Sequence, residues 1–136
     1  MKTLQVYKKI EECGVPVFEG GITGVKGLII ESGGKYGIFL NSKEINNSNE
    51  EFMVLSHEYG HYASGTLHRF NSDKSYISQC EYRADRRVIT EFLPIEKIRE
   101  AIDNGCQTSY EFSEYLDLPE EFIVKAFAHY KAMGKI

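Results

Sequence analysis

Two histidines and a glutamate in the stretch VLSHEYGHYASG, residues 54 to 65, have the spacing of a metal site. His57 and His61 are four residues apart, so on a helix they lie one turn above each other. Both imidazoles can then reach one ion at about 2.0–2.1 Å from each nitrogen. Glu58 would point beside that ion, where a carboxylate can take a proton from an attacking water. The pattern predicts either a metal-dependent hydrolytic site or, more simply, two polar residues on an ordinary helix.

A catalytic zinc ion needs a third protein ligand, which the stretch CEYRADRRVITEFLP, residues 80 to 94, can supply. On a helix, Glu81 and Asp85 fall within an apolar stripe, and unpaired carboxylates are costly to bury. The apolar members of the stripe are Ala84, Val88 and Phe92, whereas Arg83, Arg86 and Arg87 fall on the far side. We therefore predict that Glu81 is the third ligand and that Asp85 accepts the free ring N–H of a ligating histidine. One Zn²⁺ is the expected cofactor, although Mn²⁺ or Fe²⁺ also suits this ligand set.

The order of these motifs resembles a known group of enzymes. HExxH followed by ExxxD resembles the gluzincin metallopeptidases. More closely, the runs FLN (39–41), EEFMVLSHEYGHYA (50–63) and EYRADRRVITEFLP (81–94) resemble the ImmA/IrrE family of small zinc peptidases of bacteria, phages and mobile elements. The similarity covers roughly residues 15 to 94. The family usually has Phe-Ala where this chain has Arg87-Val88, and HELGH where this chain has HEYGH. These departures touch none of the expected ligands and bear on packing and partner choice.

The resemblance implies a zincin-like α+β fold and a regulatory role. Members of the family cleave or inactivate helix-turn-helix repressors and so release silenced genes. We therefore expect an endopeptidase with Glu58 as its general base, acting on a transcriptional repressor. An edge strand of the region 27–41 could align the substrate by strand addition. Three residues are candidates for a second donor to the oxyanion, and the sequence does not choose among them: His68, Tyr76 and Tyr36.

The elements that must position these residues follow from hydrophobic spacing and stop signals. The sequence predicts strands at 15–18, 27–31 and 36–41, the last two joined as a hairpin. It predicts helices at 3–13, 49–63 and 76–93, followed by short helices from Pro94 onward. Ser48 and Glu51 fit a capping box that opens the second helix. The expected buried sides are Leu4, Tyr7, Ile10 and Cys13 in the first helix, and Phe52, Leu55, Tyr59 and Tyr62 in the second.

The chain of 136 residues is long enough for one domain with a substantial core, and its 42% hydrophobic and 26% charged residues are ordinary for a globular protein. We expect a single α+β domain over residues 1–136. It would comprise an N-terminal helix and hairpin (1–49), the metal-binding helices (50–93) and a helical tail (94–136).

Charge and composition argue against several classes of protein. The net charge of −4 and the lack of a basic block predict no direct nucleic-acid binding and no membrane attachment. The beginning MKTLQVYKKIEECG lacks the apolar segment of a signal peptide, and no apolar run has the length of a membrane span. The three cysteines are odd in number and widely spaced, which favours a reducing compartment and small buried thiols. The expected location is the cytoplasm.

Two other functions are compatible with the same motifs. The short helices after Pro94 have the rhythm of a helix-turn-helix, so the chain could be a DNA-binding regulator with a structural zinc ion. Residues 94–136, however, hold five Lys/Arg against eight Asp/Glu, which is the wrong charge for phosphate contacts. The nearer alternative is an antirepressor that binds a repressor without cutting it. The presence of Glu58 argues against that alternative but leaves it open.

Overall fold

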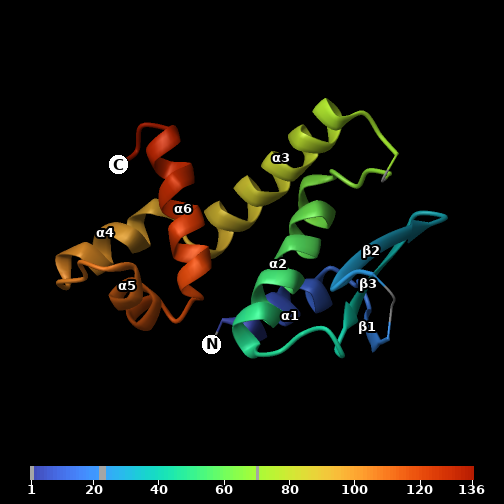
Figure 1. The fold of residues 1–136 in the computed structure, drawn as a ribbon, viewed down its shortest axis with the longest axis horizontal. Coiled ribbons are helices and arrows are strands. Elements are labelled where there is room, and N and C mark those ends of the chain that lie inside the picture. The colour runs from blue at the N-terminus through green and yellow to red at the C-terminus, as the bar shows by residue number, and fades with distance from the viewer. Residues whose placement is uncertain (1, 22–23, 70) are drawn as a thin grey trace.

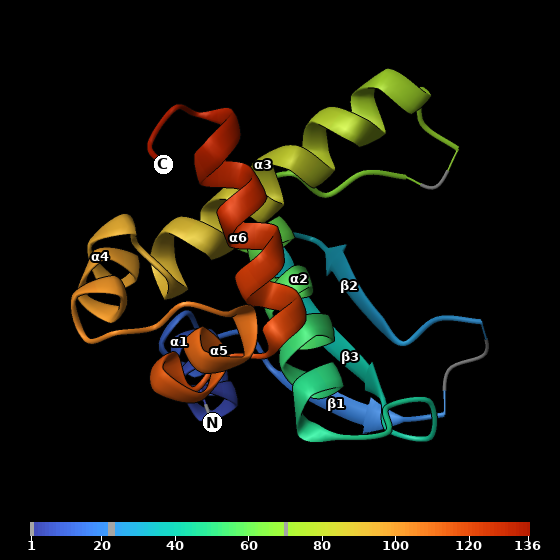
Figure 2. The same ribbon diagram turned by 60° about the vertical axis from the view of Figure 1, so that its left-hand side comes forward.

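A small sheet and a set of helices make up the residues that the computed structural model describes, namely 2–21, 24–69 and 71–136 (Figure 1). The elements in chain order are α1 (Thr3–Glu12), β1 (Val17–Gly20), β2 (Gly27–Ser32), β3 (Lys35–Asn41), α2 (Ser48–Ser64), α3 (Lys74–Phe92), α4 (Ile95–Asp103), α5 (Ser109–Leu116) and α6 (Glu120–Ala132). The sheet lies on one side of α2, and the helices α4, α5 and α6 lie on the other (Figures 1 and 2). This arrangement confirms the predicted α+β class.

The sheet has three strands in the order β1-β3-β2. β1 pairs with β3 in parallel, and β2 pairs with β3 as the predicted antiparallel hairpin. Its turn falls at Gly33 and Gly34, whose φ angles of 59° and 83° suit the tight two-residue connection. The first strand begins two residues later than predicted, at Val17. β2 stands at the edge of the sheet, and this edge borders the candidate site described below.

Helix α2 begins one residue earlier than the predicted capping box allows. Asn47 is extended and caps the helix, because its Oδ1 accepts a hydrogen bond from the Glu50 backbone N–H at 2.9 Å. Ser48 is therefore the first helical residue and not the N-cap. The prediction was wrong by one position because asparagine and serine are both good caps, and the two stand side by side in this sequence.

The buried side of α1 is only partly the predicted one, since Ile10 is buried and Tyr7 is partly buried as expected, but Leu4 and Cys13 are not. Val6 and Ile10 are almost completely buried, whereas Leu4 is 78% exposed and Cys13 is exposed. Val6 lies at helical spacing from Ile10 just as Leu4 does from Tyr7, so packing decides which of Val6 and Leu4 is buried. One contact on the packed side is the hydrogen bond that the Tyr7 hydroxyl donates to Glu51 of α2 at 2.8 Å.

Helices α2 and α3 pack at very short range, and this fixes the distance between His57 and His61 on α2 and Glu81 on α3. A Cβ atom at Gly60 would lie 2.7 Å from the Ala84 carbonyl oxygen and 2.6 Å from Val88 Cγ2, so only glycine fits. The predicted stripes are largely confirmed. Buried members are Phe52, Leu55, Tyr59, Ala84, Val88 and Phe92, Tyr62 is partly buried, and the three arginines of α3 are exposed.

The C-terminal helices share one buried apolar cluster with the rest of the chain. Phe122 of α6 packs edge-on against Phe52 of α2 with ring centroids 5.1 Å apart. The Tyr130 hydroxyl donates a hydrogen bond to the Leu93 carbonyl oxygen at 2.8 Å, which ties the end of α6 to the end of α3. Among the described residues, none of the helices has the length and apolarity needed to cross a membrane.

Candidate metal centre

Three side chains from two helices converge on one point. His57 and His61 come from α2, and Glu81 comes from α3. The two histidine Nε2 atoms are 3.2 Å apart, His57 Nε2 lies 3.2 Å from Glu81 Oε2, and His61 Nε2 lies 3.1 Å from Glu81 Oε1. Tetrahedral bonds of about 2.0–2.1 Å would place ligand atoms about 3.3 Å apart. These separations fit that geometry, and the three residues form a possible metal-binding group, as predicted.

The hydrogen bond on the other side of the His61 ring defines which nitrogen faces the group. His61 Nδ1 lies 3.0 Å from the Thr66 carbonyl oxygen, and a carbonyl can only accept, so Nδ1 carries a proton. In the neutral ring, Nε2 then presents a lone pair to a carboxylate oxygen of Glu81. Two acceptors at 3.1 Å require a cation or a proton between them. The arrangement therefore fits either a cation bound between His61 and Glu81 or a proton on His61 Nε2.

The turn that follows α2 brings Thr66 back onto His61. Gly65 has a φ of 67° and ends the helix in the left-handed conformation. The Ser64 hydroxyl donates to the Gly60 carbonyl oxygen at 2.7 Å and lies 2.6 Å from Thr66 Oγ1. The predicted helices end at residue 63 and resume at residue 76, so the sequence predicts no helix or strand for this segment. The glycine directly after the helix was the signal for a turned-back end, but nothing in the sequence identified Thr66.

Glu58, the predicted general base, is buried beside the ligands. Burial raises the pKa of its carboxyl to about 7, and the negative charge of Glu81 adds to the effect. Strand β2 passes close by, because a Cβ atom at Gly27 would lie 3.4 Å from Glu58 Cγ and 2.5 Å from Val54 Cγ1. A carboxylate with a pKa near neutrality is suited to accept and return a proton.

Of the three candidate oxyanion donors, the structure places His68 at the ligands. Its Nε2 lies 3.1 Å from Glu81 Oε1, and this hydrogen bond raises the pKa of His68 above its ordinary value. His68 therefore faces the candidate site. Tyr36 instead packs edge-on against Tyr62 at 5.1 Å, and Tyr76 is 49% exposed at the start of α3.

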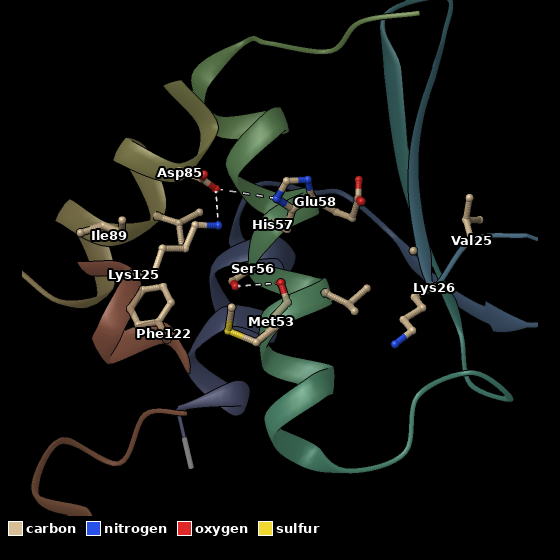
Figure 3. Close-up of a pocket in the computed structure, with 13 residues that line it drawn as sticks. Val25, Lys26, Met53, Ser56, His57, Glu58, Asp85, Ile89, Phe122 and Lys125 are labelled. Carbon is tan, nitrogen blue, oxygen red and sulfur yellow. Dashed lines mark hydrogen bonds and ion pairs between the residues drawn. The ribbon is translucent and has the colours of Figure 1, made fainter. Parts of the chain in front are cut away.

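Asp85 does not make the predicted hydrogen bond. Its Oδ1 lies 3.9 Å from His57 Nδ1, which is too long, and 3.0 Å from the Nζ of Lys125 on α6 (Figure 3). The ion pair accounts for this difference, because it draws the carboxylate oxygen toward α6. Burial lowers the pKa of His57, and the nearby charge of Glu81 opposes this effect. Sequence reasoning missed Lys125, since it lies forty residues further along the chain on a separate helix.

Two cavities flank the candidate site, and Gly27, His57 and Glu58 line both of them. The first has a volume of about 400 Å³ and lies between β2, α2, α3 and α6 (Figure 3). Its apolar walls come from Met53, Val54, Val88, Ile89 and Phe122. The second, of about 370 Å³, contains the ligands. Its other lining residues are Leu28, Ile29, Leu67 and His68.

Comparisons of this chain with models of protein families, with curated proteins and with solved structures find no significant match.

Proposed function

We propose that this protein is a zinc-dependent endopeptidase with a zincin-like fold, similar to the ImmA/IrrE family, and that it cleaves a helix-turn-helix transcriptional repressor. The observation that carries the proposal is the convergence of His57, His61 and Glu81 at separations of 3.1–3.2 Å, with the buried carboxyl of Glu58 beside them. The repressor as substrate rests on the resemblance of the sequence motifs alone.

Each residue has a defined part in this proposal. When bound, zinc supplies a Lewis acid that lowers the pKa of its water ligand to about 7 and polarises the carbonyl of the scissile bond. Glu58 accepts the proton of the attacking water and returns it to the leaving amine. His68 holds the carboxylate of Glu81 through a hydrogen bond of 3.1 Å, and we assign it the part of second donor to the oxyanion because it contacts a proposed ligand.

The surroundings of the site support an extended peptide as substrate. β2 is an edge strand, and its residues Gly27, Leu28 and Ile29 line the cavity that holds the ligands. Unpaired backbone groups at a sheet edge can pair with an added strand, which would carry a peptide past Glu58. The apolar cavity of about 400 Å³ opens beside His57 and can receive a large apolar side chain next to the scissile bond.

The test compares new protein N-termini in host cells that express the wild-type protein, Glu58→Gln or Glu114→Gln. Glu114 is an exposed glutamate of α5 and provides a matched control for the same chemical change. We expect a cut repressor with the wild type and with Glu114→Gln, and none with Glu58→Gln. Both variants should bind zinc as the wild type does, because neither change removes a ligand.

Induction of the target genes separates cleavage from binding. If Glu58→Gln induces these genes as strongly as the wild type and no termini differ, the protein is an antirepressor that binds without cutting. That result would overturn the proposed chemistry while leaving the repressor as partner. Cleavage by the Glu58→Gln variant at the wild-type rate would instead show that Glu58 is not the general base.

A further inference from the structure

One carboxylate oxygen lies between the metal ligands and the C-terminal helices. Asp85 Oδ1 is 3.0 Å from Lys125 Nζ and 3.9 Å from His57 Nδ1 (Figure 3). A histidine that ligates a metal usually donates its second ring N–H to an acceptor at about 2.7–3.2 Å, and this bond strengthens the ligand. Here the oxygen that could serve His57 lies at 3.9 Å, about 0.7 Å beyond that range, and is paired with Lys125 instead.

The position of Lys125 is fixed by the packing of α6. Phe122, one turn before it, is 3% exposed and packs against Phe52 of α2. Ile123, two residues before Lys125, and Ala126, directly after it, are fully buried. The side chain of Lys125 is 43% exposed and that of Asp85 is 29% exposed, so the pair belongs to the rim of the cavity. Ion pairs with this exposure contribute little to the stability of the fold, so stability alone does not explain the contact.

We propose that Lys125 is a positioning residue that restrains Asp85 away from His57 and thereby weakens metal binding at this site. The inference rests on the proposed function only insofar as the site binds a metal ion. It gives the C-terminal helices a direct connection to the metal centre, because α6 carries Lys125. A displacement of α6 that lengthens the contact between Lys125 and Asp85 would release the carboxylate toward His57 and strengthen the site.

The experiment measures the dissociation constant for zinc by competition with a chromophoric chelator. Lys125→Met removes the charge and keeps an unbranched stem, Lys125→Arg keeps the charge, and Lys131→Met makes the same change elsewhere on α6. We expect Lys125→Met to bind zinc about 3- to 10-fold more tightly than the wild type, because Asp85 can then reach His57. Lys125→Arg and Lys131→Met should stay within twofold of the wild type.

A double-mutant cycle with Asp85→Asn tests whether the effect passes through Asp85. In the Asp85→Asn background, Lys125→Met should no longer tighten zinc binding. The visible spectrum of the cobalt-substituted protein should change with Lys125→Met and remain as in the wild type with Lys125→Arg. Lys125→Gln gives a second neutral variant in case the methionine variant does not fold, which urea unfolding of the metal-free protein would reveal.

The outcomes separate this inference from the proposed function. Equal zinc affinity in the wild type and in both neutral variants would overturn the inference about Lys125. The inference would also fail if Lys125→Met tightened zinc binding equally in the Asp85→Asn background, because the charge of Lys125 would then act on the metal directly. A wild-type protein that binds no zinc would overturn both the inference and the proposed metal chemistry. A protein that binds zinc as described but cleaves nothing would overturn only the peptidase.

Discussion

His61 and Thr66 are joined by a hydrogen bond of 3.0 Å, from the ring Nδ1 of the histidine to the backbone carbonyl oxygen of the threonine. The bond directs His61 Nε2 toward Glu81 and defines the tautomer of the ring. Because the acceptor belongs to the backbone, the conformation of the turn sets its position, and Gly65 makes that turn. The orientation of one proposed metal ligand therefore depends on a glycine, which has no side chain to contact the metal group.

Gly65→Ala should weaken zinc binding severalfold and lower the free energy of unfolding by about 1 kcal/mol. Apart from the neighbours of Gly65 in the chain, none of the described residues lies within 4 Å of the added Cβ, so the cost comes from the left-handed backbone with φ of 67°. Gly105→Ala is a matched control, because Gly105 has φ of 94°, equally open space and a position after α4. Urea unfolding and zinc titration measure the two effects. Equal loss of zinc affinity in both variants would contradict the role given to the turn.

Gly60→Ala should damage both the fold and the metal centre. The added Cβ would meet the Ala84 backbone oxygen at 2.7 Å, and backbone cannot move aside as a side chain can. Separating α2 from α3 should cost about 1–3 kcal/mol of stability and move His61 away from Glu81. Gly20→Ala is the control, because no described residue other than its chain neighbours lies within 4 Å of the added Cβ. Wild-type stability and zinc affinity in Gly60→Ala would show that the close packing of the helices is not required.

The sequence predicted what depends on local periodicity, and missed what depends on packing between distant segments. The spacing of His57 and His61 places both on one side of any helix, so their convergence could be expected. The α+β class could be expected as well, because strand patterns and helix patterns follow one another along the chain. The partner of Asp85 could not, because Lys125 reaches it only through the packing of α6 on α2. The same holds for α1, where two helical sides of similar apolarity compete and the contact with α2 decides that Leu4 is exposed.

Zinc should stabilise the fold, and chelation should reverse the effect. A ligand that binds only the folded state at a free concentration of 100 times its dissociation constant adds about 2.7 kcal/mol. This stabilisation should shrink as the pH falls from 7.5 to 5.5, because protons compete with zinc for its ligand side chains. Urea unfolding with zinc or with a chelator measures it at each pH. His57→Ala should show no gain at either pH, and an undiminished gain in that variant would place the zinc elsewhere.

The buried hydroxyl of Tyr59 should make the fold sensitive to alkali. Burial, followed by the hydrogen bond of 2.9 Å to Glu91, raises the pKa of Tyr59. Because the pKa of Tyr59 is higher in the folded than in the unfolded protein, its neutral hydroxyl stabilises the fold fully at pH values below the unfolded pKa of about 10. This stabilisation is lost as the pH rises toward the pKa of Tyr59 in the folded protein. The free energy of unfolding should therefore fall between pH 9 and 11, and less steeply in Tyr59→Phe. Parallel curves for the two proteins would contradict this assignment.

The apolar cavity beside His57 should set the preference for the residue next to the scissile bond. Its volume of about 400 Å³ suits a large apolar side chain, and Met53 lies on its wall. Met53→Trp should fill part of the cavity and lower kcat/KM about 10- to 100-fold for peptides with a large apolar residue there, since lost pocket contacts are worth about 1–3 kcal/mol. Peptides with alanine at that position should be cut at an unchanged rate. Met133→Trp, at the end of α6, makes the same substitution away from the cavity. If Met53→Trp slows both kinds of peptide equally, the cavity supports the fold and does not select the substrate.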